Sequence, residues 1–265
     1  METRGTRLAL GMWTGLVVVF LWFPLALIMV YAFNKANVQS WPIPGVTTHW
    51  FSVAWHSEEV RQAVWLSVRA ALTATAVALL LGSMAAFAIA RFRFFGREAV
   101  SFLLVLPIAL PGIVTGMSLN SFFVFNHINL SFWTIVIGHS TFCVVIVYNN
   151  VLARLRRSQA SLIEASMDLG ADGWQTFRFV TLPLISTALV AGGLLAFALS
   201  FDEVIVTTFT AGAQNTLPLL ILGYIRLGQQ LPVVNVIAFA MIVLTVIPVT
   251  IAQRLTRESG VLRRR

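Results

Sequence analysis

Charged residues, cysteine and lysine are all scarce in this sequence, and each shortage excludes a class of protein. Only 11% of the 265 residues are charged while 58% are hydrophobic, which leaves too few charges to cover a soluble domain of this size. The lone cysteine, Cys143, excludes an internal disulfide and a metal cluster built from cysteine. The lone lysine, Lys35, lies outside any glycine-rich loop, so this chain cannot be a P-loop ATPase.

The sequence contains several long apolar runs, and they predict an integral membrane protein. A run of about 20 apolar residues is long enough to cross the hydrocarbon core as a helix. The first run exceeds the apolar core of a signal peptide, about 7 to 15 residues, and is expected to remain as an anchor. We predict a single all-α membrane domain over residues 1–265 with six transmembrane helices, at residues 8–33, 60–90, 100–125, 132–152, 184–209 and 233–252.

The arginines gather at the ends of these runs, and their distribution predicts the orientation. With the N-terminus in the cytoplasm, only Lys35, Arg61 and Arg226 lie outside, and Arg69 lies near the outer boundary. The residues then placed inside are Arg4, Arg7, Arg91, Arg93, Arg97, Arg154, Arg156, Arg157, Arg178, Arg254, Arg257, Arg263, Arg264 and Arg265. This excess follows the positive-inside rule, so we expect both termini in the cytoplasm. Membrane topology thereby accounts for the net charge of +8 without a nucleic-acid partner.

A polar segment at residues 164–183 interrupts the apolar runs. Ser161 and Glu164 have the spacing of a capping box, and Gly170 can take the left-handed conformation that ends a helix. A second helix is expected to begin at Asp172. We therefore predict two short amphipathic helices joined by a turn. Periodicity alone allows either a surface hairpin between membrane spans or a pair that docks in a groove of a partner.

The spacing in this segment resembles the EAA loop of ABC-importer permeases, the part that docks on the ATPase subunit. The residues that carry the resemblance are Glu164, Ala165, Gly170, Leu182 and Pro183, together with Ser166, which replaces the usual second alanine. Two further stretches, Leu106–Gly112 and Ala198–Glu203, resemble the second, C-type permease of spermidine and putrescine importers. The resemblance extends over nearly the whole chain.

This resemblance implies a type I ABC-importer permease whose cytoplasmic loop, residues 153–183, couples it to ATP hydrolysis in another subunit. Such a chain forms half of a translocation pathway in the bacterial inner membrane, surrounded by lipid. Its expected partners are a second, unlike permease, two ATPase subunits and an extracytoplasmic substrate-binding protein. ATP and Mg would be bound by the ATPase, so we expect no cofactor, metal or catalytic residue in this chain and do not expect it to be an enzyme.

Two adjacent acids, Asp202 and Glu203, are the only acidic residues in the predicted spans. A carboxylate in hydrocarbon is costly, so it should face a water-filled path or a cation. On a continuous helix, Ser200, Glu203 and Thr207 share one face. These three residues and Asp202 are our candidates for the substrate pathway. In the alternative, one of the acids bonds Arg69 or a backbone donor and locks helices together.

Two other features of the spans have both a structural and a functional interpretation. Pro107 and Pro111 remove two backbone donors from the third span, so we expect it to bend or unwind midway. A broken span can line a pathway, or it can be a kinked packing helix. His139, inside the fourth span, can likewise serve the function or hydrogen-bond to a neighbouring helix.

The two acids and the resemblance together favour a polyamine, such as spermidine or putrescine, as the transported solute. Alternatives within the same importer class are an oxyanion, iron or another small cation, and an oxyanion would favour a positive pathway instead. A secondary transporter or channel acting alone would leave the docking loop unexplained. A membrane-embedded enzyme has no support, since no His/Glu pair, Ser/His/Asp set or metal-ligand spacing lies on the spans.

Overall fold

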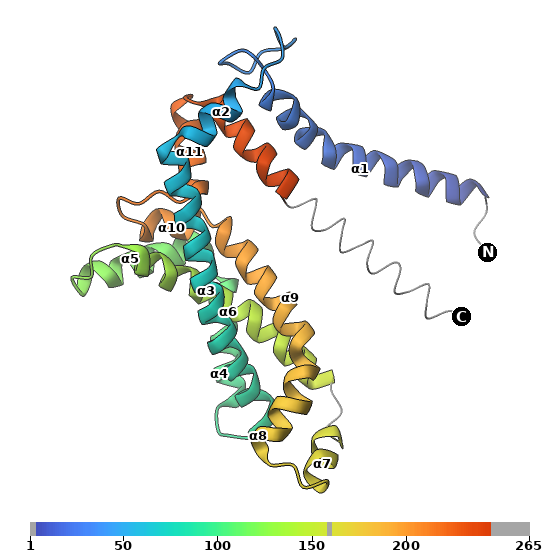
Figure 1. Ribbon diagram of the computed structural model, residues 1–265. Helices are drawn as coiled ribbons and strands as arrows, with labels where there is room; N and C mark the ends of the chain where they lie inside the picture. The colour runs from blue at the N-terminus through green and yellow to red at the C-terminus, as the bar shows by residue number, and fades with distance from the viewer. Residues whose placement is uncertain (1–3, 158–160, 245–265) are drawn as a thin grey trace. The chain divides into compact units, whose positions relative to one another are not determined.

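A computed structural model describes residues 4–157 and 161–244 of the chain (Figure 1). The described residues are mostly helical, as the apolar runs predict. The elements in chain order are α1 (Arg4–Ala32), α2 (His49–His56), α3 (Glu58–Arg91), α4 (Arg97–Ala109), α5 (Gly112–Phe125), α6 (Phe132–Arg157), α7 (Ser161–Asp168), α8 (Gly173–Thr176), the π-helical turn η1 (Phe177–Thr181), α9 (Leu182–Phe201), α10 (Ile205–Thr210), α11 (Leu217–Leu227) and a further helix at Leu231–Leu244.

These elements fall into two compact units. The larger unit runs from Gln62 to Leu220, and the smaller one combines the chain up to Arg61 with the chain from Ile221 onward. The larger unit contains most of α3, all of α4 to α10 and the start of α11. Every residue predicted to couple or to transport therefore belongs to the larger unit.

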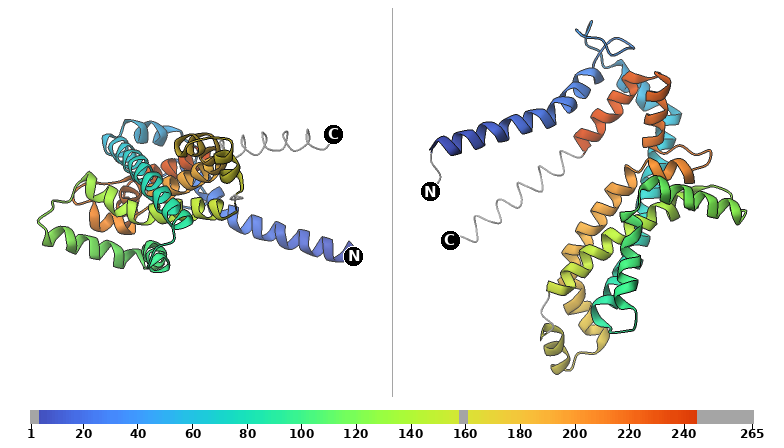
Figure 2. Two further views of the ribbon diagram at one scale, coloured as in Figure 1. Left: turned by 90° about the horizontal axis from the view of Figure 1, so that it is seen from below. Right: turned by 180° about the vertical axis from the view of Figure 1, so that it is seen from behind.

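Small residues bring α3, α6 and α9 together in the larger unit, where the three helices run side by side (Figures 1 and 2). Ala78 and Ala86 of α3 are completely buried in this contact. A Cβ atom on Gly82 would lie 2.8 Å from the carbonyl oxygen of Val144 in α6, closer than side chains approach. Lipid provides no hydrophobic force between helices, so this close approach supplies the van der Waals contact that holds the spans together.

The third predicted span is bent sharply, as its prolines predict. The chain bends by 103° between α4 and α5, and both figures show α5 turned away from the line of α4. Leu110 has the extended conformation (φ −81°, ψ 144°) favoured before a proline, and Pro111 occupies the N-cap of α5. Irregular backbone at membrane depth is tolerated only where protein buries it or where it lines a cavity. The bend is therefore a candidate position for a pathway.

The structure interrupts the fifth predicted span, residues 184–209, near its end. α9 ends at Phe201 and α10 begins at Ile205. At this break, one carboxylate oxygen of Glu203 accepts a hydrogen bond from the backbone N–H of Val206 at 2.9 Å. Glu203 is the residue before the N-cap Val204, so its side chain caps the first turn of α10 from just outside the helix. The expectation of one continuous helix is corrected accordingly.

The described residues contain four helices that are long and apolar enough to cross a membrane, or five if the bent pair is one span. The four are α1, α3, α6 and the stretch Gly173–Phe201. The sixth predicted run, residues 233–252, coincides with the helix Leu231–Leu244 as far as residue 244, and its remainder lies outside the described residues. The chain is a multi-pass helical membrane protein, while the count of six spans stays a prediction.

In the smaller unit, the segment between α1 and α2 folds around Asn34. Its side chain is buried and bonds backbone groups of its own turn. The Trp50 indole donates a hydrogen bond to the Asn34 carbonyl at 3.0 Å. The rings of Phe33, Phe51 and Phe239 pack against one another. A short polar connection thereby acquires an ordered aromatic core.

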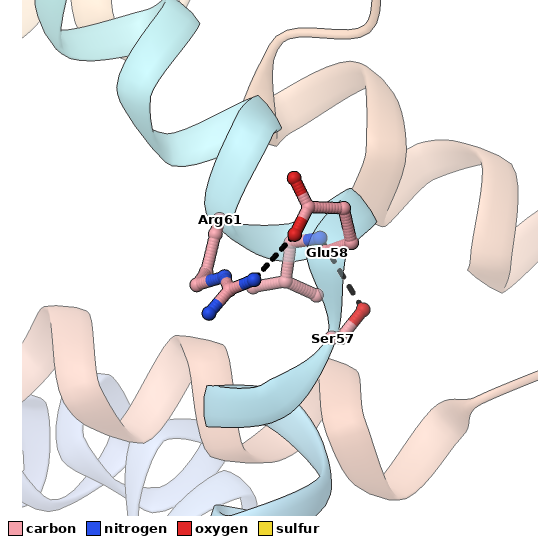
Figure 3. Close-up of polar contacts among 4 residues, drawn as sticks. Ser57, Glu58 and Arg61 are labelled. Atoms are coloured by element: carbon pink, nitrogen blue, oxygen red, sulfur yellow. Dashed lines mark hydrogen bonds and ion pairs between the residues drawn. The ribbon is translucent and has the colours of Figure 1, made fainter.

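The N-terminus of α3 begins with a serine cap in the same unit. The Ser57 hydroxyl accepts a hydrogen bond from the backbone N–H of Val60 at 3.3 Å. Figure 3 shows this contact and the ion pair between Arg61 and the Glu58 carboxylate. Both charged side chains are exposed, so the pair contributes little.

Candidate functional site

We call residues 164–183 the docking segment. Its first helix, α7, ends at a glycine in the left-handed conformation. Gly170 has φ +85°. The N–H groups of Gly170 and Ala171 donate to the carbonyls of Met167 and Ser166 at 2.9 and 3.1 Å. These two bonds form the Schellman motif that commonly ends a helix. The prediction that Gly170 ends the first helix is confirmed.

Capping side chains are found on the second short helix. The Asp172 carboxylate accepts the Gln175 N–H at 2.8 Å, and the Gln175 side-chain oxygen accepts the Asp172 N–H at 2.9 Å. Together they make a complete capping box, so the predicted helix start at Asp172 is confirmed. The predicted capping box of Ser161 and Glu164 stays a prediction, because residues 158–160, just before Ser161, lie outside the described residues.

Ser166, the residue that departs from the EAA pattern, joins the two short helices. Its hydroxyl lies 3.1 Å from the hydroxyl of Thr176, which is buried. The Thr181 hydroxyl in turn donates to the Thr176 carbonyl at 3.3 Å. An alanine at position 166 could not make the first of these bonds. Serine therefore adds a polar link inside the docking segment.

The docking segment is continuous with one long span and touches another. The π-helical turn η1 leads directly into α9, because the Leu182 N–H donates to the Phe177 carbonyl, and Pro183 follows in the first turn of α9. The Phe177 ring packs against Phe87 of α3, with centroids 5.8 Å apart. A displacement of this segment would therefore act on both α3 and α9.

Large apolar side chains of the docking segment are uncovered. Leu169 is 89% exposed, Trp174 is 65% exposed and Phe179 is 69% exposed. Glu164 and Ala165 are exposed on the same short helix pair. Large uncovered apolar side chains of this kind indicate a contact surface for another molecule.

A small cavity of about 140 Å³, the break cavity, lies at the bend between α4 and α5, next to the interruption between α9 and α10. Its lining residues are Pro107, Ile108, Leu110, Gly112, Thr115, Phe142, Leu199, Glu203 and Val206. The walls are thus mainly apolar, and Glu203 is the one charged residue among them.

Glu203 and Thr115 give the break cavity its polar chemistry. One Glu203 oxygen caps α10, while the Thr115 hydroxyl oxygen is buried and has no hydrogen-bond partner among the described residues. An unsatisfied buried hydroxyl costs about 1 to 3 kcal/mol, so a group that bonds it would be favoured. Asp202 does not line the cavity and is exposed at the C-cap of α9. Sequence reasoning missed Thr115, although its position one helical turn after Pro111 was a signal.

His139 joins α6 to α9 and α10 through two buried hydroxyl groups. Its Nδ1 atom lies 2.7 Å from the Ser200 hydroxyl, and its Nε2 atom lies 2.8 Å from the Thr207 hydroxyl. The Thr207 hydroxyl donates its one proton to the Glu203 carbonyl at 2.6 Å. It must therefore accept from Nε2–H, which leaves Nδ1 to accept from Ser200. Of the two interpretations of this histidine, the structure supports hydrogen bonding between helices.

The four predicted pathway residues thus lie in different environments. Glu203 lines the break cavity and Asp202 is exposed beside it. Ser200 and Thr207 are 2% and 0% exposed, and their hydroxyls contact His139. A pathway role for Ser200 and Thr207 stays a prediction.

Arg69 does not lock either acid in place. Its guanidinium lies over the Phe132 ring at 5.0 Å and near the Trp65 ring at 5.9 Å, both distances to ring centroids. The described part of the chain contains no ion pair between Arg69 and Asp202 or Glu203. The locking interaction that the structure does contain is the bond from Glu203 to a backbone donor.

No cluster that could bind a metal accompanies these features. Within residues 4–157 and 161–244, no group of three or more His, Cys, Asp and Glu side chains could hold a metal ion. The site therefore consists of a docking segment at one end of α9 and a cavity with a single carboxylate at the other.

Comparison with known proteins yields a family and named relatives. A family described as binding-protein-dependent transport system inner membrane component matches residues 78–258. The spermidine/putrescine transport system permease protein PotC of Haemophilus influenzae is 34% identical over 92% of this chain and 95% of its own. PotC of Escherichia coli is 34% identical over 95% of both chains. The putrescine transport system permease protein PotI of Escherichia coli is 35% identical over 83% of this chain and 80% of its own.

A solved structure has the same fold. A bacterial ABC transporter involved in the import of the acidic polysaccharide alginate superposes with a TM-score of 0.70. The match covers 97% of this chain and 98% of that one, at 16% sequence identity. At this identity the likeness shows the fold alone.

Proposed function

Because this chain belongs to the family of inner membrane components of binding-protein-dependent transport systems, we propose that it forms half of the pathway of an ATP-driven polyamine importer. The predicted all-α permease fold is confirmed by the family and by the solved ABC transporter. The chain is a membrane transport subunit rather than an enzyme. Family membership implies a separate ATPase and a substrate-binding protein as its partners.

The proposed substrate class rests on the carboxylate of Glu203 in the break cavity. A primary ammonium group carries a positive charge and donates hydrogen bonds, which suits Glu203 and the unpaired Thr115 hydroxyl together. The apolar lining suits the methylene arm of a polyamine. An oxyanion would meet a like charge at the same place. Relatives named for spermidine and putrescine transport support this assignment.

Coupling to ATP would act through the docking segment. Leu169, Trp174 and Phe179 offer an uncovered apolar surface that suits a groove on an ATPase. α9 has 20 residues, so it extends about 30 Å as a rigid rod. A displacement at its docking end would move its other end, where Asp202 and Glu203 adjoin the break cavity. This geometry suits a switch between two states of the pathway.

The His139 network would keep the pathway end of α9 aligned during that motion. Ser200 on α9 and Thr207 on α10 both bond His139 of α6, so the three helices would move together. Asp202, exposed at the end of α9, would add a second negative charge near Glu203 for an arriving cation.

A second, unlike permease would supply the other half of the pathway, as the separate names of polyamine permeases suggest. The arginine distribution supports an orientation with both termini and the docking segment in the cytoplasm, where ATP is found.

The test is uptake by proteoliposomes that contain the whole complex, with ATP inside and substrate-loaded binding protein outside. The panel would include labelled spermidine, putrescine, sulfate and ferric iron. We expect saturable, ATP-dependent uptake of a polyamine that other polyamines inhibit and sulfate does not. Uptake of an anion without any uptake of polyamines would overturn the proposed substrate class.

A further inference from the structure

The loop between α3 and α4 combines arginines with exposed aromatic rings, and the transport mechanism above makes no use of it. Residues 91–98 contain three arginines, three phenylalanines and one glutamate. Phe92, Phe94 and Phe95 are 63%, 42% and 105% exposed. Exposed phenylalanine rings are unfavourable in water, so a covering surface is expected.

Two of the arginines frame a cavity in this loop. Arg93 and Arg97 line a hollow of about 420 Å³ together with Phe94, Gly96, Glu98 and Ala99. Gly96 has φ +80° and turns the chain into α4, which brings the two arginines to one hollow. Two guanidinium groups against one carboxylate leave the lining with net positive charge. Guanidinium groups bind phosphate oxygens in a bidentate manner.

The loop lies where spanning helices leave the membrane. It connects α3, a candidate span, to α4, the first half of the bent pair. Phe102 and Leu103, in the second turn of α4, are 67% and 61% exposed, as side chains that face lipid are. Near the other end of the loop, Phe87 of α3 contacts Phe177 of the docking segment. The loop therefore lies at the membrane surface on the side of the docking segment.

We propose that the basic aromatic loop, residues 91–98, binds an anionic phospholipid of the leaflet on the docking-segment side. The phenylalanines enter the boundary between head groups and acyl chains, and Arg93 and Arg97 bind the phosphate of the head group. Charge complementarity selects an anionic lipid over a zwitterionic one, because only the anionic head group leaves its phosphate charge uncompensated.

Photocrosslinking tests this directly. The variant Phe95→p-benzoylphenylalanine keeps an aromatic ring at the most exposed position and captures whatever covers it. The whole complex would be irradiated in vesicles of phosphatidylcholine with a minority of phosphatidylglycerol, and the adducts identified by mass spectrometry. We expect lipid adducts, with phosphatidylglycerol enriched over its share of the bilayer by roughly 5-fold to 30-fold, the effect of one to two arginines near a membrane surface.

Two matched double variants separate this site from general attraction to charge. R93Q/R97Q should keep the lipid adducts and lose the enrichment. R156Q/R157Q removes two exposed arginines at the end of α6 and should retain it. Should R93Q/R97Q fail to assemble, the single variants should each lower the enrichment by roughly 5-fold. An adduct with the ATPase or another protein instead of lipid would overturn the proposal, and so would enrichment that survives R93Q/R97Q or falls equally in both pairs.

Discussion

Glu203 has two roles in the structure, and two substitutions separate them. Its carboxylate caps α10 by accepting the Val206 N–H at 2.9 Å, and it is the charged group of the break cavity. Glu203→Gln keeps a side-chain oxygen at the same reach and removes the charge. Glu203→Ala removes both the cap and the charge. The pair therefore distinguishes the cost of a lost helix cap from the cost of a lost cation partner.

The expected magnitudes differ for the two substitutions. Loss of the hydrogen bond to the Val206 N–H costs about 0.5 to 1.5 kcal/mol of stability, which applies to Glu203→Ala alone. A hydrogen bond to a charged group contributes about 1.5 to 3 kcal/mol, so loss of the charge should weaken the hold on an ammonium group by about 10- to 150-fold in both variants. A neutral residue at membrane depth also avoids the insertion cost of a charge. Glu203→Gln should therefore assemble at least as well as the unmodified chain.

The assay combines thermal melting of the purified complex with ATP-dependent spermidine uptake at several substrate concentrations. Asp202→Asn is the comparison variant, because it removes a neighbouring charge that is exposed and lies outside the cavity lining. We expect Glu203→Gln to lose uptake with an unchanged melting temperature, and Glu203→Ala to lose uptake and to melt at a lower temperature. Asp202→Asn should reduce uptake less than either Glu203 variant. If Glu203→Gln transports spermidine at the unmodified rate, the carboxylate is structural and the argument for a cationic solute fails.

Three further substitutions test the coupling, the histidine network and the packing. Gly170→Val forces a β-branched residue to φ +85°, at a cost of about 1 to 2 kcal/mol. This variant should abolish the stimulation of the ATPase by loaded binding protein. The control Gly173→Ala, at a position with open space around it, should leave the stimulation intact. Ser200→Ala removes one partner of His139 and should lower stability by about 0.6 to 1.7 kcal/mol in a melting experiment; lost uptake with unchanged melting would instead assign Ser200 to the pathway. Gly82→Ala would place a methyl group 2.8 Å from a backbone carbonyl of α6. We therefore expect the stability to fall by about 1 to 3 kcal/mol and less assembled complex to be present in membranes. An undiminished yield of complex would contradict the packing argument.

The sequence by itself determined the features that depend on a few neighbouring residues. Apolar run length predicted the membrane class, because a bilayer requires about 20 apolar residues per helix. Pro107 and Pro111 predicted the bend that the structure has at 103°, and Gly170 predicted a left-handed helix end. An acid in a membrane span is costly, so Asp202 and Glu203 were identified as candidates before any contact was known. Each of these inferences uses local stereochemistry or the solvent alone.

Only the tertiary structure decided what surrounds the candidate residues. The sequence placed Ser200, Glu203 and Thr207 on one face of a continuous helix, but α9 ends at Phe201 and the Glu203 side chain bonds the first turn of α10. His139 lies 61 residues from Ser200 in sequence, yet their side chains form a hydrogen bond. Thr115, which precedes α6 in the chain, and Glu203, which follows it, line the same cavity. Burial and pairing depend on which distant segments pack together, and no short-range pattern in a single sequence contains that information.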